Sequence, residues 1–156
     1  MRRGMAIFFD IGDTLASPVV VGGSLTRLEV YPFVPEVLTR LRASGGDQVP
    51  VVLGLISNTG DATAARMADL LATSGLQRLV EPGLCLFSSV EGLNKSQPAL
   101  FERAHNRAGV PAARCMFVGE DAAERAVAAS VGFRVSPQPL HALHLVETEL
   151  STDRPA

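Results

Sequence analysis

The sequence has no excess of charge of either sign and has only two cysteines. Its 156 residues include 14 Lys and Arg against 16 Asp and Glu, a net charge of −2. This balance gives no sign of a nucleic-acid groove or of a patch for an anionic membrane, so we expect neither partner. Cys85 and Cys115 both lie in apolar runs, which predicts buried free thiols in a reducing compartment rather than a disulfide.

Long apolar runs are also missing. No stretch approaches the ~20 residues that a membrane-spanning helix needs. The run from Met5 to Phe9 follows two arginines, but Asp10 ends it too early for a secretion signal. We therefore expect a cytoplasmic protein without a membrane partner.

The composition is that of a folded chain. Hydrophobic residues make up 47% and charged residues 19%, which excludes a disordered or fibrous protein. The length suits one domain with one hydrophobic core. We predict a single domain over residues 1–150 and a short frayed tail over residues 151–156.

Short apolar runs alternate with amphipathic stretches along the chain. This alternation predicts an α/β fold with three layers, a Rossmann-like parallel sheet with helices on both of its faces. The predicted strands are 5–9, 51–56, 84–87, 115–119 and 132–135. The predicted helices are 35–42, 61–74, 97–107 with Ser96 as the N-cap, 121–129 and 140–150.

Residues 14–33 depart from this alternation. Three valines, the pair Gly22-Gly23 and a loosely alternating stretch to Val30 predict a β-hairpin. It directly follows the acidic residues after the first strand. We therefore expect a small flap that projects over that end of the sheet.

Polar residues stand where several predicted strands end. Asp10 and Asp13 follow the first strand, residues 57–60 (SNTG) follow the second, and Glu120 and Asp121 follow the fourth. Ligands of open α/β sheets bind beyond the carboxyl ends of the strands. Carboxylates from two strands, with a hydroxyl and a lysine, indicate a site for a divalent cation and a phosphate, and oxygen ligands favour Mg²⁺.

Four stretches in this order resemble the motifs of the haloacid dehalogenase-like (HAD) hydrolase superfamily, in a member with a minimal cap. They are residues 8–15 (FFDIGDTL), 55–59 (LISNT), 94–101 (NKSQPALF) with Lys95, and 118–121 (VGED) with Glu124 one turn later. The resemblance covers the chain from Ala6 to Val135. It implies a Mg²⁺-dependent phosphohydrolase that acts on a phosphorylated substrate.

The resemblance also implies a role for each matching residue. Asp10 is the nucleophile and forms an aspartyl-phosphate intermediate. Lys95 anchors Asp10 and adds positive charge at the substrate. Ser57, Asn58 and the backbone N–H groups that follow would bind the phosphate at a helix start. The implied Mg²⁺ ligands are Asp10, the Gly12 carbonyl and Glu120 or Asp121.

One position departs from the family pattern. The phosphatases of this family usually carry a second aspartate two residues after the nucleophile, as the acid and base of the reaction, and here that residue is Gly12. Positioned acid–base catalysis is typically worth ~10²–10⁴ in rate. Asp13 could replace it, or could instead shape the loop and the surroundings of the metal. Glu124 is expected to lie on a solvated helix face.

The missing aspartate keeps other hypotheses open. One is a catalytically impaired HAD-fold protein that binds a phosphorylated ligand or a partner protein. Another is a dehalogenase, since that branch also lacks the second aspartate, but it carries a helical cap for which the segment between Asp10 and Ser57 is too short. An open site would favour a larger substrate or a lid from a partner chain, which makes a homodimer plausible.

Overall fold

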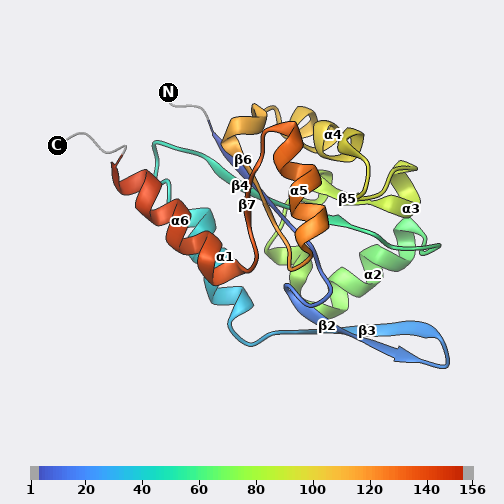
Figure 1. The fold of residues 1–156 in the computed structure, drawn as a ribbon. Helices are drawn as coiled ribbons and strands as arrows, with labels where there is room; N and C mark the ends of the chain where they lie inside the picture. The colour runs from blue at the N-terminus through green and yellow to red at the C-terminus, as the bar shows by residue number, and fades with distance from the viewer. Residues whose placement is uncertain (1–3, 153–156) are drawn as a thin grey trace.

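The computed structural model describes residues 4–152 and contains a five-stranded parallel sheet between helices (Figure 1). The strands lie in the order β5-β4-β1-β6-β7, which places β1 at the centre. Their bounds are Met5–Phe9 for β1, Val51–Ser57 for β4, Cys85–Phe87 for β5, Cys115–Val118 for β6 and Arg134–Ser136 for β7. The predicted fold class is confirmed.

Two separate hydrophobic layers cover the two faces of the sheet. Because side chains alternate along a strand, Met5, Ile7 and Phe9 of β1 enter one layer and Ala6 and Phe8 enter the other. The first layer is completed by α1 (Val34–Ala43), α2 (Ala64–Ser74) and α6 (Pro139–Thr152), and the second by α4 (Pro98–Ala108) and α5 (Ala122–Val131).

The remaining elements are short. Helix α3 (Ser88–Glu91) directly follows β5 and was not predicted, because four residues are too few for a periodic pattern. Single 3₁₀ turns occupy Leu76–Arg78 (η1), Pro82–Leu84 (η2) and Ala112–Arg114 (η3).

The predicted helices are all present, with corrections at their ends. The prediction of Ser96 as an N-cap is wrong: Gln97 holds that position before α4, and Ser96 instead donates its backbone N–H to Asn94 Oδ1 at 2.9 Å. Helix α2 begins at Ala64 rather than at residue 61. Helix α6 continues through Thr152, two residues into the predicted tail, and the rest of that tail lies outside the described residues.

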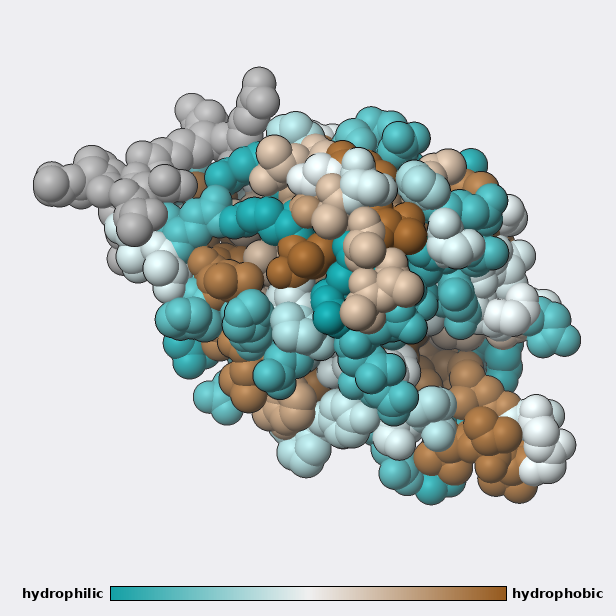
Figure 2. Space-filling view, in the orientation of Figure 1, coloured by the Kyte–Doolittle hydropathy of each residue, from teal (hydrophilic) through white to brown (hydrophobic). Residues whose placement is uncertain are grey.

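The predicted hairpin is confirmed as β2 (Ala16–Val21) and β3 (Ser24–Val30), which pair antiparallel. Gly22 and Gly23 form its turn with φ angles of 58° and 81°, values that glycine adopts without strain. The hairpin extends away from the sheet below α2 (Figure 1). At its tip Val20 and Val21 are 60% and 62% exposed, and apolar side chains gather there in Figure 2.

Cys85 and Cys115 are both free thiols, as predicted, with Cys115 buried and Cys85 half-buried. Among residues 4–152 we find no helix with the length and apolar character needed to cross a membrane.

Candidate active site

The central strand β1 delivers Asp10 to the middle of the carboxyl edge of the sheet. Its backbone N–H donates to the Val118 carbonyl at 2.9 Å, which ties it to the end of the neighbouring strand β6. Gly119 directly follows β6, and a Cβ there would lie 2.9 Å from the Phe117 ring and 3.4 Å from Asp10 Cβ. A glycine is therefore needed beside Asp10, and Glu120 and Asp121 follow it directly in the chain.

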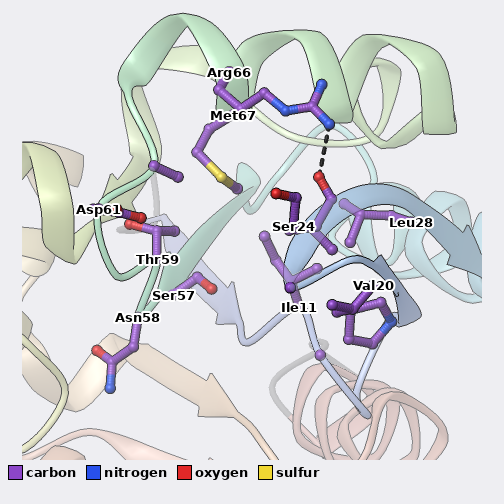
Figure 3. A pocket seen from close by; sticks show the side chains of 15 residues that line it. Ile11, Val20, Ser24, Leu28, Ser57, Asn58, Thr59, Asp61, Arg66 and Met67 are labelled. Atoms are coloured by element: carbon purple, nitrogen blue, oxygen red, sulfur yellow. Dashed lines mark hydrogen bonds between the residues drawn. The ribbon is translucent and has the colours of Figure 1, made fainter.

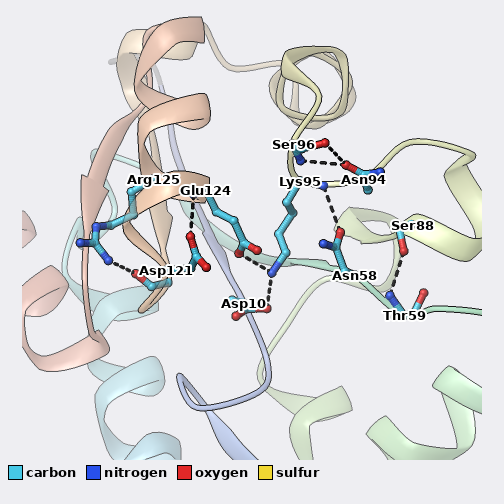
Figure 4. Close-up of polar contacts among 11 residues, drawn as sticks. Asp10, Asn58, Thr59, Ser88, Asn94, Lys95, Ser96, Asp121, Glu124 and Arg125 are labelled. Atoms are coloured by element: carbon cyan, nitrogen blue, oxygen red, sulfur yellow. Dashed lines mark hydrogen bonds and ion pairs between the residues drawn. The ribbon is translucent and has the colours of Figure 1, made fainter.

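Lys95 joins two carboxylates in the interior of the site (Figure 4). Its Nζ lies 2.7 Å from Asp10 Oδ1 and 2.7 Å from Glu124 Oε1, and its side chain is only 4% exposed. The structure thus brings Asp10 and Lys95 together as predicted. The expectation for Glu124 is wrong: its side chain is 21% exposed and faces the lysine rather than solvent, because α5 begins beside the end of β1.

Asn58 holds the backbone of Lys95 rather than standing free. Its Oδ1 accepts the Lys95 backbone N–H at 3.0 Å. This bond connects the end of β4 to the loop before α4, and it aligns the lysine with Asp10 (Figure 4). The acceptor oxygen of Asn58 is therefore engaged with protein, and only its amide NH₂ group is left for a ligand in the role predicted for it.

Ser57 ends β4 and is buried at 7% exposure. The expectation of a helix start directly after it needs correction, because Thr63, the N-cap of α2, comes six residues later. The intervening loop is held by α3: Ser88 Oγ accepts the Thr59 N–H at 2.8 Å, and Thr59 Oγ1 lies 2.6 Å from Ser89 Oγ. The Thr59 N–H is thus already occupied, and a phosphate bound here would rely on Ser57 and nearer groups.

Gly12 and Asp13 lie in a tight loop between β1 and the hairpin. Asp13 is exposed and has a φ angle of 60°, and its N–H donates to the Ala16 carbonyl at 2.9 Å. Among the described non-glycine residues, Asp13 alone has a positive φ. A residue held in this conformation has a structural role in the loop whether or not it also transfers a proton.

Glu120 and Asp121 are both exposed at the start of α5. Asp121 is the N-cap of α5, and its Oδ1 accepts the Glu124 N–H at 3.0 Å. Arg125 donates to the Gly119 carbonyl at 2.8 Å, which fixes the same turn (Figure 4). Over residues 4–152 the structure brings together no group of three or more His, Cys, Asp or Glu side chains suited to a metal.

The predicted Mg²⁺ ligands nevertheless fit a hard cation. They are oxygen atoms from two neighbouring strand ends, with a backbone carbonyl among them, and Mg²⁺ usually keeps several waters beside one or two carboxylates. Asp10 uses Oδ1 for Lys95, and Asp121 uses Oδ1 for its cap, so the second oxygen of each takes no part in these contacts.

A pocket of about 570 Å³ lies between the hairpin and the end of β4 (Figure 3). Its polar edge includes Ser57, Asn58 and Thr59 from the predicted phosphate motif. Its opposite wall comes from the hairpin, which was predicted as a flap over this end of the sheet. The alternating pattern of β2 and β3 could have suggested one wall-forming face, but not its distance from Ser57.

Known structures resemble the whole chain. No family model and no curated protein sequence matches it. A HAD-superfamily hydrolase from Ehrlichia chaffeensis has a TM-score of 0.69 at 12% identity, over 97% of this chain and 99% of that one. A D,D-heptose 1.7-bisphosphate phosphatase from B. bronchiseptica, complexed with magnesium and phosphate, has a TM-score of 0.67 at 13% identity, over 93% of this chain and 99% of that one.

A dehalogenase crystallised with an intermediate complex is 26% identical at a TM-score of 0.57. The match covers 70% of this chain but only 44% of the dehalogenase, so this chain spans less than half of that protein. Together these similarities show that the chain has the fold of HAD-type hydrolases, in agreement with the motif order of its sequence.

Proposed function

We propose that the protein is a Mg²⁺-dependent phosphohydrolase that acts through an aspartyl-phosphate on Asp10. The observation that carries the proposal is the buried ion pair of Lys95 Nζ with Asp10 Oδ1 at 2.7 Å, at the carboxyl end of the central strand. A structural ion pair needs no position at the ligand edge of the sheet, whereas a nucleophile does.

The proposed reaction proceeds in two displacements at phosphorus. An oxygen of Asp10 attacks the phosphorus atom while the P–O bond to the leaving group breaks, and the departing alkoxide takes a proton from Asp13 or from solvent. Water then attacks the acyl phosphate and releases inorganic phosphate, a proton and the free Asp10 carboxylate. Lys95 orients Asp10 and offsets the negative charge that gathers as two anions approach. Glu124 holds the lysine from its other side, while Ser57 would donate its hydroxyl to a phosphate oxygen.

The proposed metal ligands are Asp10, the Gly12 carbonyl and Glu120 or Asp121. When bound there, Mg²⁺ supplies positive charge that screens the phosphate from the attacking carboxylate. The heptose bisphosphatase with the same fold was crystallised with magnesium and phosphate, which supports this cofactor.

A direct test is the hydrolysis of 4-nitrophenyl phosphate with and without Mg²⁺ by the wild type and by Asp10→Asn and Asp13→Asn. We expect turnover that requires Mg²⁺ and is lost in Asp10→Asn. Loss in Asp13→Asn as well would assign the acid–base role to Asp13. Hydrolysis that persists in Asp10→Asn would contradict the proposal.

The second candidate function is a protein that binds a phosphorylated ligand without turning it over. Gly12 favours it, because no carboxylate occupies the usual acid–base position and Asp13 is held in an exposed turn. A binding protein would show no hydrolysis in the assay above, and its Asp10→Asn variant would still bind phosphate. A dehalogenase is less favoured, because a two-stranded hairpin stands where a helical cap would be needed.

A further inference from the structure

The hairpin presents one apolar face to the candidate active site. The cross-strand pairs Pro18–Leu28 and Val20–Leu25 both line the 570 Å³ pocket, whereas Val19 and Val21 do not. This is the alternation expected of a strand with one face toward a cavity. Ile11 and Met67 extend the apolar lining from the loop after β1 and from α2 (Figure 3).

A one-residue irregularity in β3 creates this face. Val19 pairs with Arg27 but Val20 pairs with Leu25, so Thr26 has no partner across the hairpin. Leu25 and Leu28 are three positions apart and would point to opposite faces of a regular strand. The bulge at Thr26 turns Leu25 to the same side as Leu28, which is the re-aiming of a side chain that bulges near active sites provide.

Arg66 of α2 stabilises the bulge through hydrogen bonds to its backbone. Its Nη2 donates to the carbonyls of Leu25 and Thr26 at 2.8 and 3.1 Å, and its Nη1 donates to Asp69 at 3.0 Å. Arg66 itself lines the pocket, but these bonds turn its guanidinium toward protein acceptors. It is therefore a positioning residue for the wall rather than a cation that would bind a charged substrate.

We infer that this pocket accepts the leaving group of the substrate, and that the substrate is a phosphate monoester of an uncharged, largely apolar alcohol of small-molecule size. The inference rests on the proposed phosphohydrolase function. The pocket begins at Ser57 and Asn58, where the phosphate would lie, and its volume is within the range of small-molecule sites. Apart from Ser24, the side chains of its far wall are aliphatic, so most hydroxyl groups of a sugar would find no hydrogen-bond partner there. Asp61 also lines the pocket and disfavours a second negative charge on the leaving group.

The test compares two primary phosphate esters with a six-membered ring, cyclohexylmethyl phosphate and glucose 6-phosphate, with 4-nitrophenyl phosphate as the general substrate. We expect kcat/KM to favour the cyclohexylmethyl ester by about tenfold or more. Val20→Thr puts a hydroxyl in the wall and should raise the KM for this ester about fourfold. Val21→Thr is the matched control, equally exposed but outside the pocket, and should leave KM unchanged.

The outcomes separate the two proposals. Equal use of both ring esters, a preference for glucose 6-phosphate, or an equal effect of the two valine variants would overturn the inference. Hydrolysis of 4-nitrophenyl phosphate alone would also overturn it, in favour of a phosphorylated macromolecule, while the hydrolase function would stand. Hydrolysis of none of the three esters would refute the hydrolase function itself, and with it this substrate class.

Substitution of Arg66 tests independently whether the hairpin wall of the pocket binds the leaving group. Arg66→Lys retains the positive charge but cannot reach both bulge carbonyls with the same planar geometry. We expect a higher KM for cyclohexylmethyl phosphate with little change in kcat, and an inhibition constant for inorganic phosphate, which has no leaving group, that changes by less than twofold. A fall in kcat with no change in KM would contradict a positioning role.

Discussion

The Nζ atom of Lys95 lies 2.7 Å from Asp10 Oδ1, although the two residues are 85 positions apart in the chain. Both side chains are nearly enclosed, at 4% and 13% exposure, and Glu124 completes the cluster from α5. One lysine thus stands between two carboxylates, so the cluster carries a net negative charge. Such a site favours a further cation, which is consistent with the proposed Mg²⁺.

Removing the lysine should cost both stability and activity. Lys95→Met leaves two carboxylates facing each other without a cation, and we expect the free energy of unfolding to fall by about 3 kcal/mol. Urea unfolding measures this change, and the hydrolysis assay should show at least a ~10²-fold loss. The matched control is Arg103→Met, which removes a cation whose side chain is 42% exposed and should cost less than about 1 kcal/mol.

The double variant Lys95→Met/Glu124→Gln separates the two effects. It removes one of the two carboxylate charges that Lys95→Met leaves without a cation, so it should recover part of the lost stability without recovering turnover. If the double variant were less stable than Lys95→Met, repulsion between the carboxylates could not be the cause.

Gly12 offers a gain-of-function experiment. A Cβ at this position would meet only Pro18 Cγ at 3.8 Å, an ordinary contact, and Gly12 has no positive φ that would strain a side chain. Gly12→Asp should therefore fold normally and place a carboxylate at the position that corresponds, by motif resemblance, to the acid–base aspartate of HAD-type phosphatases. We expect kcat for phosphate esters with poor leaving groups to rise about 10²-fold.

The control for this variant is Gly12→Asn, which has nearly the same shape but cannot take up and release the proton. It should not exceed the wild type. An equal gain in both variants would show that the side chain acts by filling space or binding substrate, and not by proton transfer.

The stability of Asp13 variants should depend on how readily each residue adopts the backbone conformation of Asp13. Its φ of 60° is costly for alanine, by about 1 kcal/mol, whereas Asp and Asn adopt it more readily and Gly without penalty. We expect Asp13→Ala to be the least stable in urea, with Asp13→Gly and Asp13→Asn near the wild type. Equal stability of all three variants would mean that the loop relaxes to another conformation.

Most of the sheet and the order of the site residues could be predicted from the sequence, because both depend on local patterns. The run from Met5 to Phe9 ends at Asp10, and that adjacency alone places the carboxylate at a strand end. The contact of Glu124 with Lys95 could not be predicted in the same way. It depends on where α5 begins relative to β1, which no local pattern reports.

The bulge at Thr26 could not be predicted from the sequence for a similar reason. The stretch from Ser24 to Val30 only loosely alternates, and a strand that slips by one residue exchanges its two faces. Pairing with β2 and the bonds from Arg66 determine which face Leu25 joins. Those bonds join residues about 40 positions apart in the chain. The apolar wall of the pocket therefore could not be predicted from local sequence patterns.

The two thiols should titrate well above their usual range. Burial raises the pKa of Cys85 to about 11, with a smaller contribution from Glu81, and burial raises the pKa of Cys115 to about 12. In the unfolded chain a cysteine has a pKa near ~8.5. Between about pH 9 and 11 the unfolded state therefore loses its thiol protons first, and the free energy of unfolding should fall as pH rises.

Alkylation by iodoacetamide measures this effect at neutral pH. Native Cys85 should react about 10²-fold more slowly than a free cysteine, because the thiolate is the reacting form. Cys85→Ser identifies the modified site. Rapid labelling of native Cys85 at pH 7.5 would show that the thiol is not held in its neutral form.

The hairpin leaves and rejoins the rest of the chain at a single point. Ala16 pairs with Val30, and the Tyr31 N–H donates to the Leu15 carbonyl at 3.0 Å, so its two ends are bound to each other. At the far end, a Cβ on either Gly22 or Gly23 would meet nothing within 4 Å. Extra residues inserted at that turn would lengthen the hairpin without displacing Asp10 or Lys95. Chimeras that exchange this segment could therefore change which alcohols are accepted while the phosphate chemistry stays the same.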